Sequence, residues 1–288
     1  MITITAATGR LGRLVIAELL ERGVPAGEIV AAVRNPEKAA DLEAQGVQVR
    51  LADYDRPETL EPAFAGTDKL LLIPSADYSQ RFPQAKNAVD AAVAADVPLI
   101  AYASFVNAAT STLRLADEHK QTEAHIRESG LPFVFLRNGA YTELYCGEMG
   151  DIAPALASGT MIGSGGDGRI SGATRPDLAA AAAAVLTGDG PVNTAYELGG
   201  APFTLADVAA EFAAQSGKPL AYQNLSVDEY SQALASWGVP KPFADLLADT
   251  SFAIERGDWY TESTELEQLI GRPATPLADV VAAALKTF

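Results

Sequence analysis

The first half of the chain repeats one pattern, in which a short apolar run is followed by an amphipathic or alanine-rich stretch and then by another apolar run. Runs such as Leu70–Ile73 are apolar at every position, which is typical of strands buried on both faces of a sheet. The apolar runs predict six strands, at Ile2–Ala6, Ile29–Val33, Val47–Leu51, Lys69–Pro74, Leu99–Ser104 and Phe133–Arg137. The stretches between them predict helices at Leu11–Arg22, Glu37–Gln45, Pro57–Phe64, Gln80–Ala95 and Leu115–Ser129.

Alternating strands and helices of this kind predict an α/β fold, a doubly wound parallel sheet with right-handed crossovers. An all-helical fold is the alternative. It is disfavoured because the apolar runs are five or six residues long, rich in Val and Ile, and bounded by Gly and Pro. We therefore expect residues 1–140 to form one Rossmann-type domain.

The regular alternation of predicted strands and helices ends after about residue 140. Gly159–Gly172 is rich in glycine and predicts a hairpin-like segment, and Asp177–Leu186 predicts an alanine-rich helix. Shorter elements are expected at Ala195–Leu198, Leu205–Ser216, Leu220–Asn224, Val227–Ala235 and Leu277–Leu285. No Ser-, Gly- or Pro-rich linker separates the halves, so residues 141–288 are expected to form a smaller α+β lobe on the substrate side, interleaved with the edge of the first sheet.

The first predicted strand runs directly into a glycine-containing turn and a helix. Glycines let a backbone approach a pyrophosphate closely, and the helix that follows offers unpaired N–H groups and the positive end of its dipole. This context predicts a dinucleotide-binding turn made of Ala6, Ala7, Thr8, Gly9, Arg10, Leu11 and Gly12. Gly163–Gly168 is also glycine-rich, but no Lys follows it and it does not join a strand to a helix, so a hairpin turn is the better interpretation.

The end of the second predicted strand indicates which dinucleotide binds. An NAD-binding chain would place Asp or Glu there to bind the ribose hydroxyls, but this chain has Arg34, with Lys38 one turn into the next helix. A guanidinium suits a 2′-phosphate, so NADPH is the predicted cofactor, although both residues are also compatible with plain surface charges. Asp53 follows the third strand, where it either contacts the adenine or caps the third helix.

The charge and the cysteine content limit the partners and the compartment. Acidic residues outnumber basic ones by 37 to 21, and the net charge of −16 argues against a nucleic acid partner. Cys146 is the single cysteine, so no intrachain disulfide forms and a cytoplasmic location fits best. The N-terminal residues contain no apolar stretch long enough for export or for spanning a membrane, and no membrane association is expected. A homodimer is compatible with the sequence, which does not fix the oligomeric state.

Several segments together resemble the NmrA-like group of atypical short-chain dehydrogenases, and most closely its bacterial NADPH:quinone oxidoreductase subgroup. The likeness extends over nearly the whole chain. It is carried by Thr5–Gly12, Val33–Pro36, Leu70–Ser75, Leu115–His119, Leu136–Gly139, Ala173–Arg175 and Ile270–Pro273.

The resemblance implies a set of site residues. The cofactor would be contacted by Pro74, Ser75 and Ser104 at the ends of strands, and by Asn138, Gly139 and Tyr141 after the sixth strand. The substrate would be contacted by Tyr141, Glu143 and Arg175, although core packing explains Tyr141 equally well. The chain departs from the family pattern at Ala6, where glycine is usual, and at Ala140 and Leu144, where an aromatic residue and an asparagine are usual.

The Tyr-x-x-x-Lys pair of typical short-chain dehydrogenases is missing, because Leu115 and His119 occupy its positions. Ketone reduction needs an acid for the developing alkoxide, whereas a quinone that accepts a hydride becomes an aromatic hydroquinone monoanion that water can protonate. His119 is either a catalytic acid or an ordinary helix residue. With two histidines and one cysteine in the chain, we expect neither a metal site nor a cysteine nucleophile.

Two functions are therefore open. The first is an enzyme that reduces quinones or similar electron-poor acceptors with NADPH. The second is a redox regulator that senses NADP(H) without turnover, as other NmrA-like proteins do. The absence of the Tyr, and the presence of Ala6 in place of a glycine, favour the regulator. The likeness to the quinone reductase subgroup favours the enzyme, which we prefer.

Overall fold

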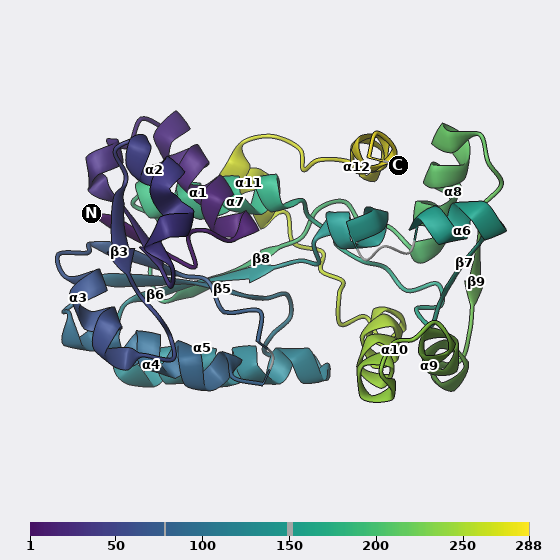
Figure 1. Cartoon of the computed structure of the whole chain (residues 1–288), viewed down its shortest axis with the longest axis horizontal. Helices are drawn as coiled ribbons and strands as arrows, with labels where there is room; N and C mark the ends of the chain where they lie inside the picture. Colours follow the sequence, from purple (N-terminus) through teal and green to yellow (C-terminus); the bar gives the residue numbers. More distant parts are fainter. Residues whose placement is uncertain (78, 149–151, 288) are drawn as a thin grey trace.

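A parallel seven-stranded sheet forms the centre of the larger part of the molecule (Figure 1). The computed structural model describes residues 1–77, 79–148 and 152–287. The strand order is β3-β2-β1-β4-β5-β6-β8, so the order reverses between β1 and β4. The strands are β1 (Ile2–Thr5), β2 (Ile29–Val33), β3 (Gln48–Leu51), β4 (Lys69–Leu72), β5 (Leu99–Phe105), β6 (Phe133–Asn138) and β8 (Thr194–Leu198). The predicted doubly wound α/β fold is confirmed.

Helices cover both faces of this sheet, because alternate side chains of each strand point to opposite sides and apolar side chains predominate on both (Figure 1). One face carries α1 (Arg10–Glu21), α2 (Ala40–Ala44), α7 (Arg175–Thr187) and α11 (Glu265–Ile270). The other carries α3 (Leu60–Phe64), α4 (Arg81–Ala94) and α5 (Arg114–Ser129). Short 3₁₀ turns at Ala26–Glu28, Pro36–Ala39 and Pro57–Thr59 precede β2, α2 and α3.

All six predicted strands are present, with shifted ends that have local causes. The first strand ends at Thr5 because Ala6 already has a φ of +46° and belongs to the turn. The fourth ends at Leu72, two residues before Pro74, which has no N–H to donate to a neighbouring strand. The fifth and sixth strands extend one residue further than predicted, to Phe105 and Asn138.

The smaller lobe contains a two-stranded parallel sheet of β7 (Thr160–Gly163) and β9 (Ala221–Asn224). Around it lie a π-helical turn (Leu144–Glu148), α6 (Ile152–Ser158), α8 (Leu205–Ser216), α9 (Val227–Ser236), α10 (Lys241–Glu255) and α12 (Leu277–Leu285) (Figure 1). Residues after 140 also supply α7, β8 and α11 to the large sheet and its helical layer.

The predicted hairpin at Gly159–Gly172 is wrong, because β7 pairs in parallel with β9, far along the chain. The glycines after β7 serve instead to bring the loop against α10. A Cβ at Gly168 would lie 2.2 Å from the carbonyl oxygen of Ile254, and the Ser164 hydroxyl donates to the carbonyl of Ala248 at 2.9 Å. Close packing against α10 explains Gly168, and the segment does not form a hairpin.

The carboxyl ends of the large sheet face the smaller lobe. Phe105, at the end of β5, packs against Trp259 with ring centroids 4.7 Å apart. In doubly wound sheets, ligands bind at this edge where the strand order reverses. No helix among the described residues is long and apolar enough to cross a membrane.

Candidate active site

The turn between β1 and α1 has the geometry of an anion-binding turn. Ala6 bends the chain with a φ of +46°, and the N–H of Gly9 donates to the Ala6 carbonyl at 2.8 Å. Gly9 is the N-cap of α1 and no side chain caps the helix, so its first N–H groups remain available to a ligand. Thr8 is partly buried and Gly9 and Arg10 are exposed, whereas the neighbouring residues Ala7, Leu11 and Gly12 are buried.

Gly12 keeps α1 close to this turn. A Cβ at Gly12 would lie 2.7 Å from the Ala6 carbonyl oxygen and 2.8 Å from the Ala7 Cα. Both neighbours are backbone atoms, so only glycine fits without moving the helix. The turn therefore provides the close approach and the open helix N-terminus that a pyrophosphate requires.

Arg34 and Lys38 lie directly beyond β2, and both are exposed. Neither side chain forms a hydrogen bond or ion pair with another residue in the described part of the chain. The nearby Arg13 is already engaged, since it binds Asp41 at 2.5 Å and, by that hydrogen bond, lowers the pKa of the Asp41 carboxyl. Two cations thus remain available for a 2′-phosphate, which fits NADPH.

Asp53 does not cap a helix. The 3₁₀ turn before α3 has Arg56 as its N-cap, so the capping alternative is wrong. Asp53 instead stabilises its own loop, in which its Oδ1 accepts from the N–H of Asp55 at 3.1 Å. Contact with the adenine stays a prediction.

The predicted nicotinamide-side residues come from the ends of β4 and β6. Pro74 and Ser75 follow β4 and are partly buried, and the Ser75 carbonyl accepts from Arg81 at 3.2 Å. Gly139 fixes the segment after β6, because its N–H donates to the Leu198 carbonyl at 2.8 Å and a Cβ there would lie 2.3 Å from the Ser171 carbonyl oxygen. This holds Asn138 close to Tyr141, whose phenol it contacts.

The three predicted substrate residues form one cluster. The Arg175 guanidinium carbon lies 4.3 Å from the ring centroid of Tyr141, and the Arg175 backbone N–H donates to Oε1 of Glu143 at 2.9 Å. Burial raises the pKa of Tyr141, so the phenol is neutral at physiological pH. Whether the three residues contact substrate stays a prediction.

Glu148 connects this cluster to the dinucleotide turn, a link that the sequence analysis missed. Its carboxylate binds Arg175 through two contacts, at 2.9 Å and 2.8 Å, and also binds Arg10 at 2.6 Å. Glu148 lies in a π-helical turn with a backbone kink at Cys146 and Gly147. No spacing rule pairs such a turn with the start of a distant helix, so no sequence signal predicts this contact.

Ser104 is not placed with the other predicted cofactor residues. Its hydroxyl is buried and donates to Oε1 of Glu123 on α5 at 2.6 Å. The same carboxylate binds Arg137 at 2.9 Å and 2.7 Å. Ser104 thus belongs to a buried polar network between the sheet and α5, and its geometry gives no support to a cofactor contact.

His119 is buried between α5, β5 and the start of α4. Its Nε2 faces Nη1 of Arg81 at 3.3 Å and its Nδ1 faces the Tyr102 hydroxyl at 2.8 Å. A guanidinium can only donate, so Nε2 accepts and Nδ1 carries the hydrogen. Burial, with the charge of Arg81 added, lowers the pKa of His119 to about 3. A neutral imidazole with both nitrogens engaged is poorly suited to act as an acid, and the structural role is favoured.

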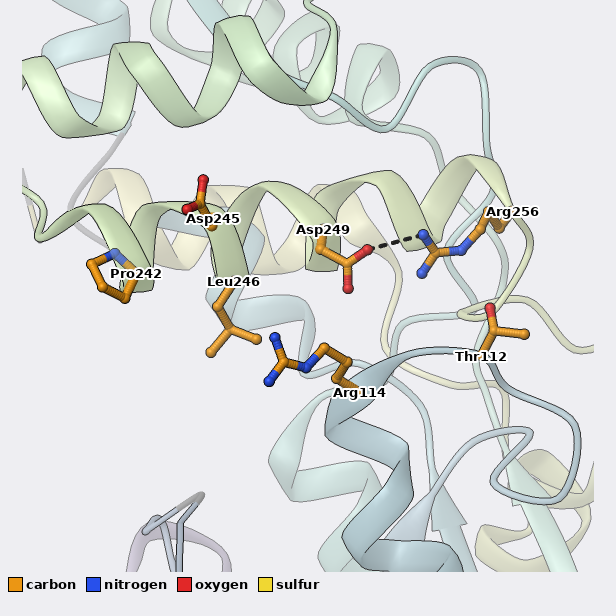
Figure 2. A pocket seen from close by; sticks show the side chains of 7 residues that line it. All are labelled: Thr112, Arg114, Pro242, Asp245, Leu246, Asp249 and Arg256. Atoms are coloured by element: carbon orange, nitrogen blue, oxygen red, sulfur yellow. Dashed lines mark hydrogen bonds and ion pairs between the residues drawn. The ribbon is translucent and has the colours of Figure 1, made fainter.

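A surface pocket of about 310 Å³ lies between α10 and the start of α5, and Figure 2 shows the side chains around it. It is lined by Thr112, Arg114, Pro242, Asp245, Leu246, Asp249 and Arg256, none of which is a predicted site residue. Among the described residues there is also no group of three His, Cys, Asp or Glu side chains able to hold a metal ion.

The features of the dinucleotide turn agree with a match to a known protein family. The family model described as NAD(P)H-binding matches residues 6–189. The chain belongs to this family. The match includes the dinucleotide turn, Arg34 and the segment after β6, and together with the relatives described next it confirms the resemblance inferred from the motifs.

Near full-length relatives are reductases. The chain is 48% identical to quinone oxidoreductase 2 of Escherichia coli over 98% of this chain and 97% of the relative. The crystal structure of the E. coli enzyme complexed with NADPH matches with a TM-score of 0.95 and 47% identity, covering 99% of this chain and 100% of that one. The Citrobacter triphenylmethane reductase complexed with NADP(H) matches with a TM-score of 0.92 and 41% identity, over 99% and 100% of the two chains.

Proposed function

We propose that this chain reduces quinones with NADPH by direct hydride transfer. The observation that carries the proposal is the combination, at one edge of the sheet, of an open anion-binding turn with two exposed cations, Arg34 and Lys38, that no other described residue engages. The likeness to E. coli quinone oxidoreductase 2 supports the choice of acceptor.

Two groups of residues would hold the two ends of the cofactor, one group at the phosphates and the other at the nicotinamide. The first N–H groups of α1 would bind the pyrophosphate, and Arg34 and Lys38 the 2′-phosphate. Pro74, Ser75 and the segment Asn138–Tyr141 would flank the nicotinamide. When bound there, NADPH supplies the hydride.

The chemistry of the site favours a quinone over an alcohol or ketone. Leu115 and His119 stand in place of a Tyr-Lys acid pair, and His119 is neutral and engaged on both sides. The remaining contribution of the protein is to stack the acceptor against the nicotinamide and to exclude water. This is catalysis by proximity and orientation. A quinone tolerates this because its reduced form is a stabilised anion that water protonates.

Reduction of a triphenylmethane dye is a second candidate. A hydride that adds to the cationic carbon of such a dye leaves a neutral product, so no proton donor is required. The net charge of −16 would also attract a cation. The triphenylmethane reductase at 41% identity supports this candidate. A sensor without turnover is not favoured, since the near full-length relatives are reductases.

A direct assay separates these functions. Purified protein, NADPH and 1,4-benzoquinone are mixed without oxygen, and the loss of NADPH absorbance and the formation of hydroquinone are both followed. We expect equal amounts of the two, and a parallel reaction with a triphenylmethane dye tests the second candidate. If NADPH binds but neither acceptor is reduced, the chain is not a reductase of these substrates. We also propose a cytoplasmic location, which suits a chain whose single cysteine, Cys146, is buried; the homodimer stays a prediction.

A further inference from the structure

Arg81 is a buried cation beside the segment that follows β4. It is the first residue of α4, and only 8% of it is exposed. Its Nε donates to the Ser75 carbonyl at 3.2 Å and its Nη1 to Nε2 of His119 at 3.3 Å. The guanidinium also lies close enough to Tyr141 to act on the pKa of that phenol.

Arg81 contacts one of the two segments proposed to flank the nicotinamide and acts electrostatically on the other. Ser75 follows β4 and Tyr141 follows β6, and the guanidinium lies near both. A ring stacked on the nicotinamide would therefore have Arg81 at its edge. Charges act strongly at such a buried site, because little water is present to screen them.

Arg175, the other buried arginine in this region, is less suited to bind a new anion. Its guanidinium is held by the Glu148 carboxylate at 2.9 Å and 2.8 Å and lies 3.8 Å from Glu143. Two carboxylates beside it repel a further negative charge. The Ser75 carbonyl and Nε2 of His119, both uncharged acceptors, fix the direction of two N–H groups of Arg81.

We propose that Arg81 binds the oxygen of the acceptor that becomes negatively charged when a quinone accepts the hydride. This inference rests on the proposed quinone reduction. In that step the C4–H bond of the dihydronicotinamide breaks and an O–H bond forms on one quinone oxygen. The nicotinamide is oxidised, the quinone ring becomes aromatic, and an electron pair comes to rest on the opposite oxygen as a phenolate. Water later protonates this oxygen.

His119 is a positioning residue in this arrangement. Its Nδ1–H donates to the Tyr102 hydroxyl, which leaves Nε2 to accept from Arg81 and to direct the guanidinium toward the site. A glutamine can accept the same bond through its amide oxygen. His119→Gln should therefore cost less than about tenfold in turnover, well below the roughly 10²–10⁴ lost with a general acid. A thousandfold loss in a folded His119→Gln protein would instead make His119 the acid.

A binding experiment tests Arg81 without turnover. The probe is 4-nitrophenol, which resembles the phenolate product and turns yellow when ionised. With NADP⁺ present, the wild-type protein should bind it as the phenolate at a pH where the free probe is neutral. Arg81→Met should bind it neutral or not at all, and Arg81→Lys, which keeps the charge, should retain part of the yellow form. Arg114→Met is the matched control, since Arg114 begins α5 as Arg81 begins α4 but is exposed on the pocket of Figure 2.

Kinetics with a quinone series provide an independent test. Removal of one electrostatic donor to a developing oxyanion typically costs about 10²–10³ in kcat, and Arg81→Met should lose that much with 1,4-benzoquinone. Chlorinated benzoquinones stabilise their own oxyanion, so the same variant should lose less with them. A wild-type protein that reduces no quinone contradicts the proposed function, and the 4-nitrophenol result then still decides whether Arg81 binds an oxyanion. An equal loss for every quinone, with the phenolate still bound by folded Arg81→Met, overturns the inference.

Discussion

Arg34 and Lys38 are the residues on which the choice of cofactor depends. Their charge and their place after β2 could be predicted from the sequence. Their availability to bind a phosphate could not, because it depends on the nearby Asp41 pairing with Arg13 and not with Arg34 or Lys38. Arg34→Ala should weaken NADPH binding by about 1–3 kcal/mol and leave NADH binding nearly unchanged. Titration of both cofactors measures this, with the exposed Arg56→Ala as a control. Equal losses for the two cofactors would show that Arg34 does not recognise the 2′-phosphate.

Ala6 is a strained residue in the cofactor turn. Its φ of +46° lies in the left-handed region, which costs an alanine on the order of 1–2 kcal/mol. Glycine adopts this conformation freely, so Ala6→Gly should keep the turn in its binding geometry more of the time. We expect tighter NADPH binding, by up to about tenfold for each 1.4 kcal/mol recovered. Unchanged or weaker binding in a calorimetric titration would mean that the turn tolerates alanine.

Other parts of the site were not predictable residue by residue. The sequence left His119 open between two roles, and only the contacts with Arg81 and Tyr102 favour one of them. Ser104 was expected on the cofactor side because it ends a strand, yet alternate residues of a strand face opposite layers, and this one faces α5. A position at a strand end therefore does not by itself assign a side chain to the site.

At the scale of elements, the central strands were predictable because both their faces are buried and their sequences are mostly apolar. α10 was missed. Its buried residues are mainly small, as at Ala244, Ala248 and Ala253, while Phe243 is exposed, so its apolar stripe is faint in the sequence. The pairing of β7 with β9 was missed for a different reason, since parallel partners are joined by long connections that leave no local signal.

The packing of α1 on the turn gives an element-scale prediction. Because a Cβ at Gly12 would meet the backbone of Ala6 and Ala7 below 3.0 Å, Gly12→Ala must push α1 away. We expect a loss of about 1–3 kcal/mol in the free energy of unfolding, and at least tenfold weaker NADPH binding as the helix N-terminus moves. Gly27→Ala is the matched control, because a Cβ there has open space. Similar behaviour of the two variants in denaturation and binding would contradict this role of Gly12.

At the scale of the whole molecule, burial of a neutral His119 links stability to pH. Burial lowers the pKa of this imidazole from 6.5 to about 3, so below about pH 6.5 the unfolded chain takes up a proton that the folded chain does not. The free energy of unfolding should then fall by up to about 1.4 kcal/mol per pH unit as the pH drops from 6.5 toward 3. Urea denaturation between about pH 5 and 7 should show a flatter dependence for His119→Gln. A slope unchanged in His119→Gln would contradict a neutral buried imidazole.

In the proposed reaction, hydride passes directly from bound NADPH to a quinone without a proton donor from the protein. The most direct measurement is a single turnover of bound NADPH with 1,4-benzoquinone, using NADPH that carries deuterium at the transferred position of C4. We expect deuterium to slow the oxidation, and a change of solvent from water to heavy water to affect it hardly at all. An oxidation rate that is indifferent to deuterium at C4 but strongly slowed in heavy water would contradict it.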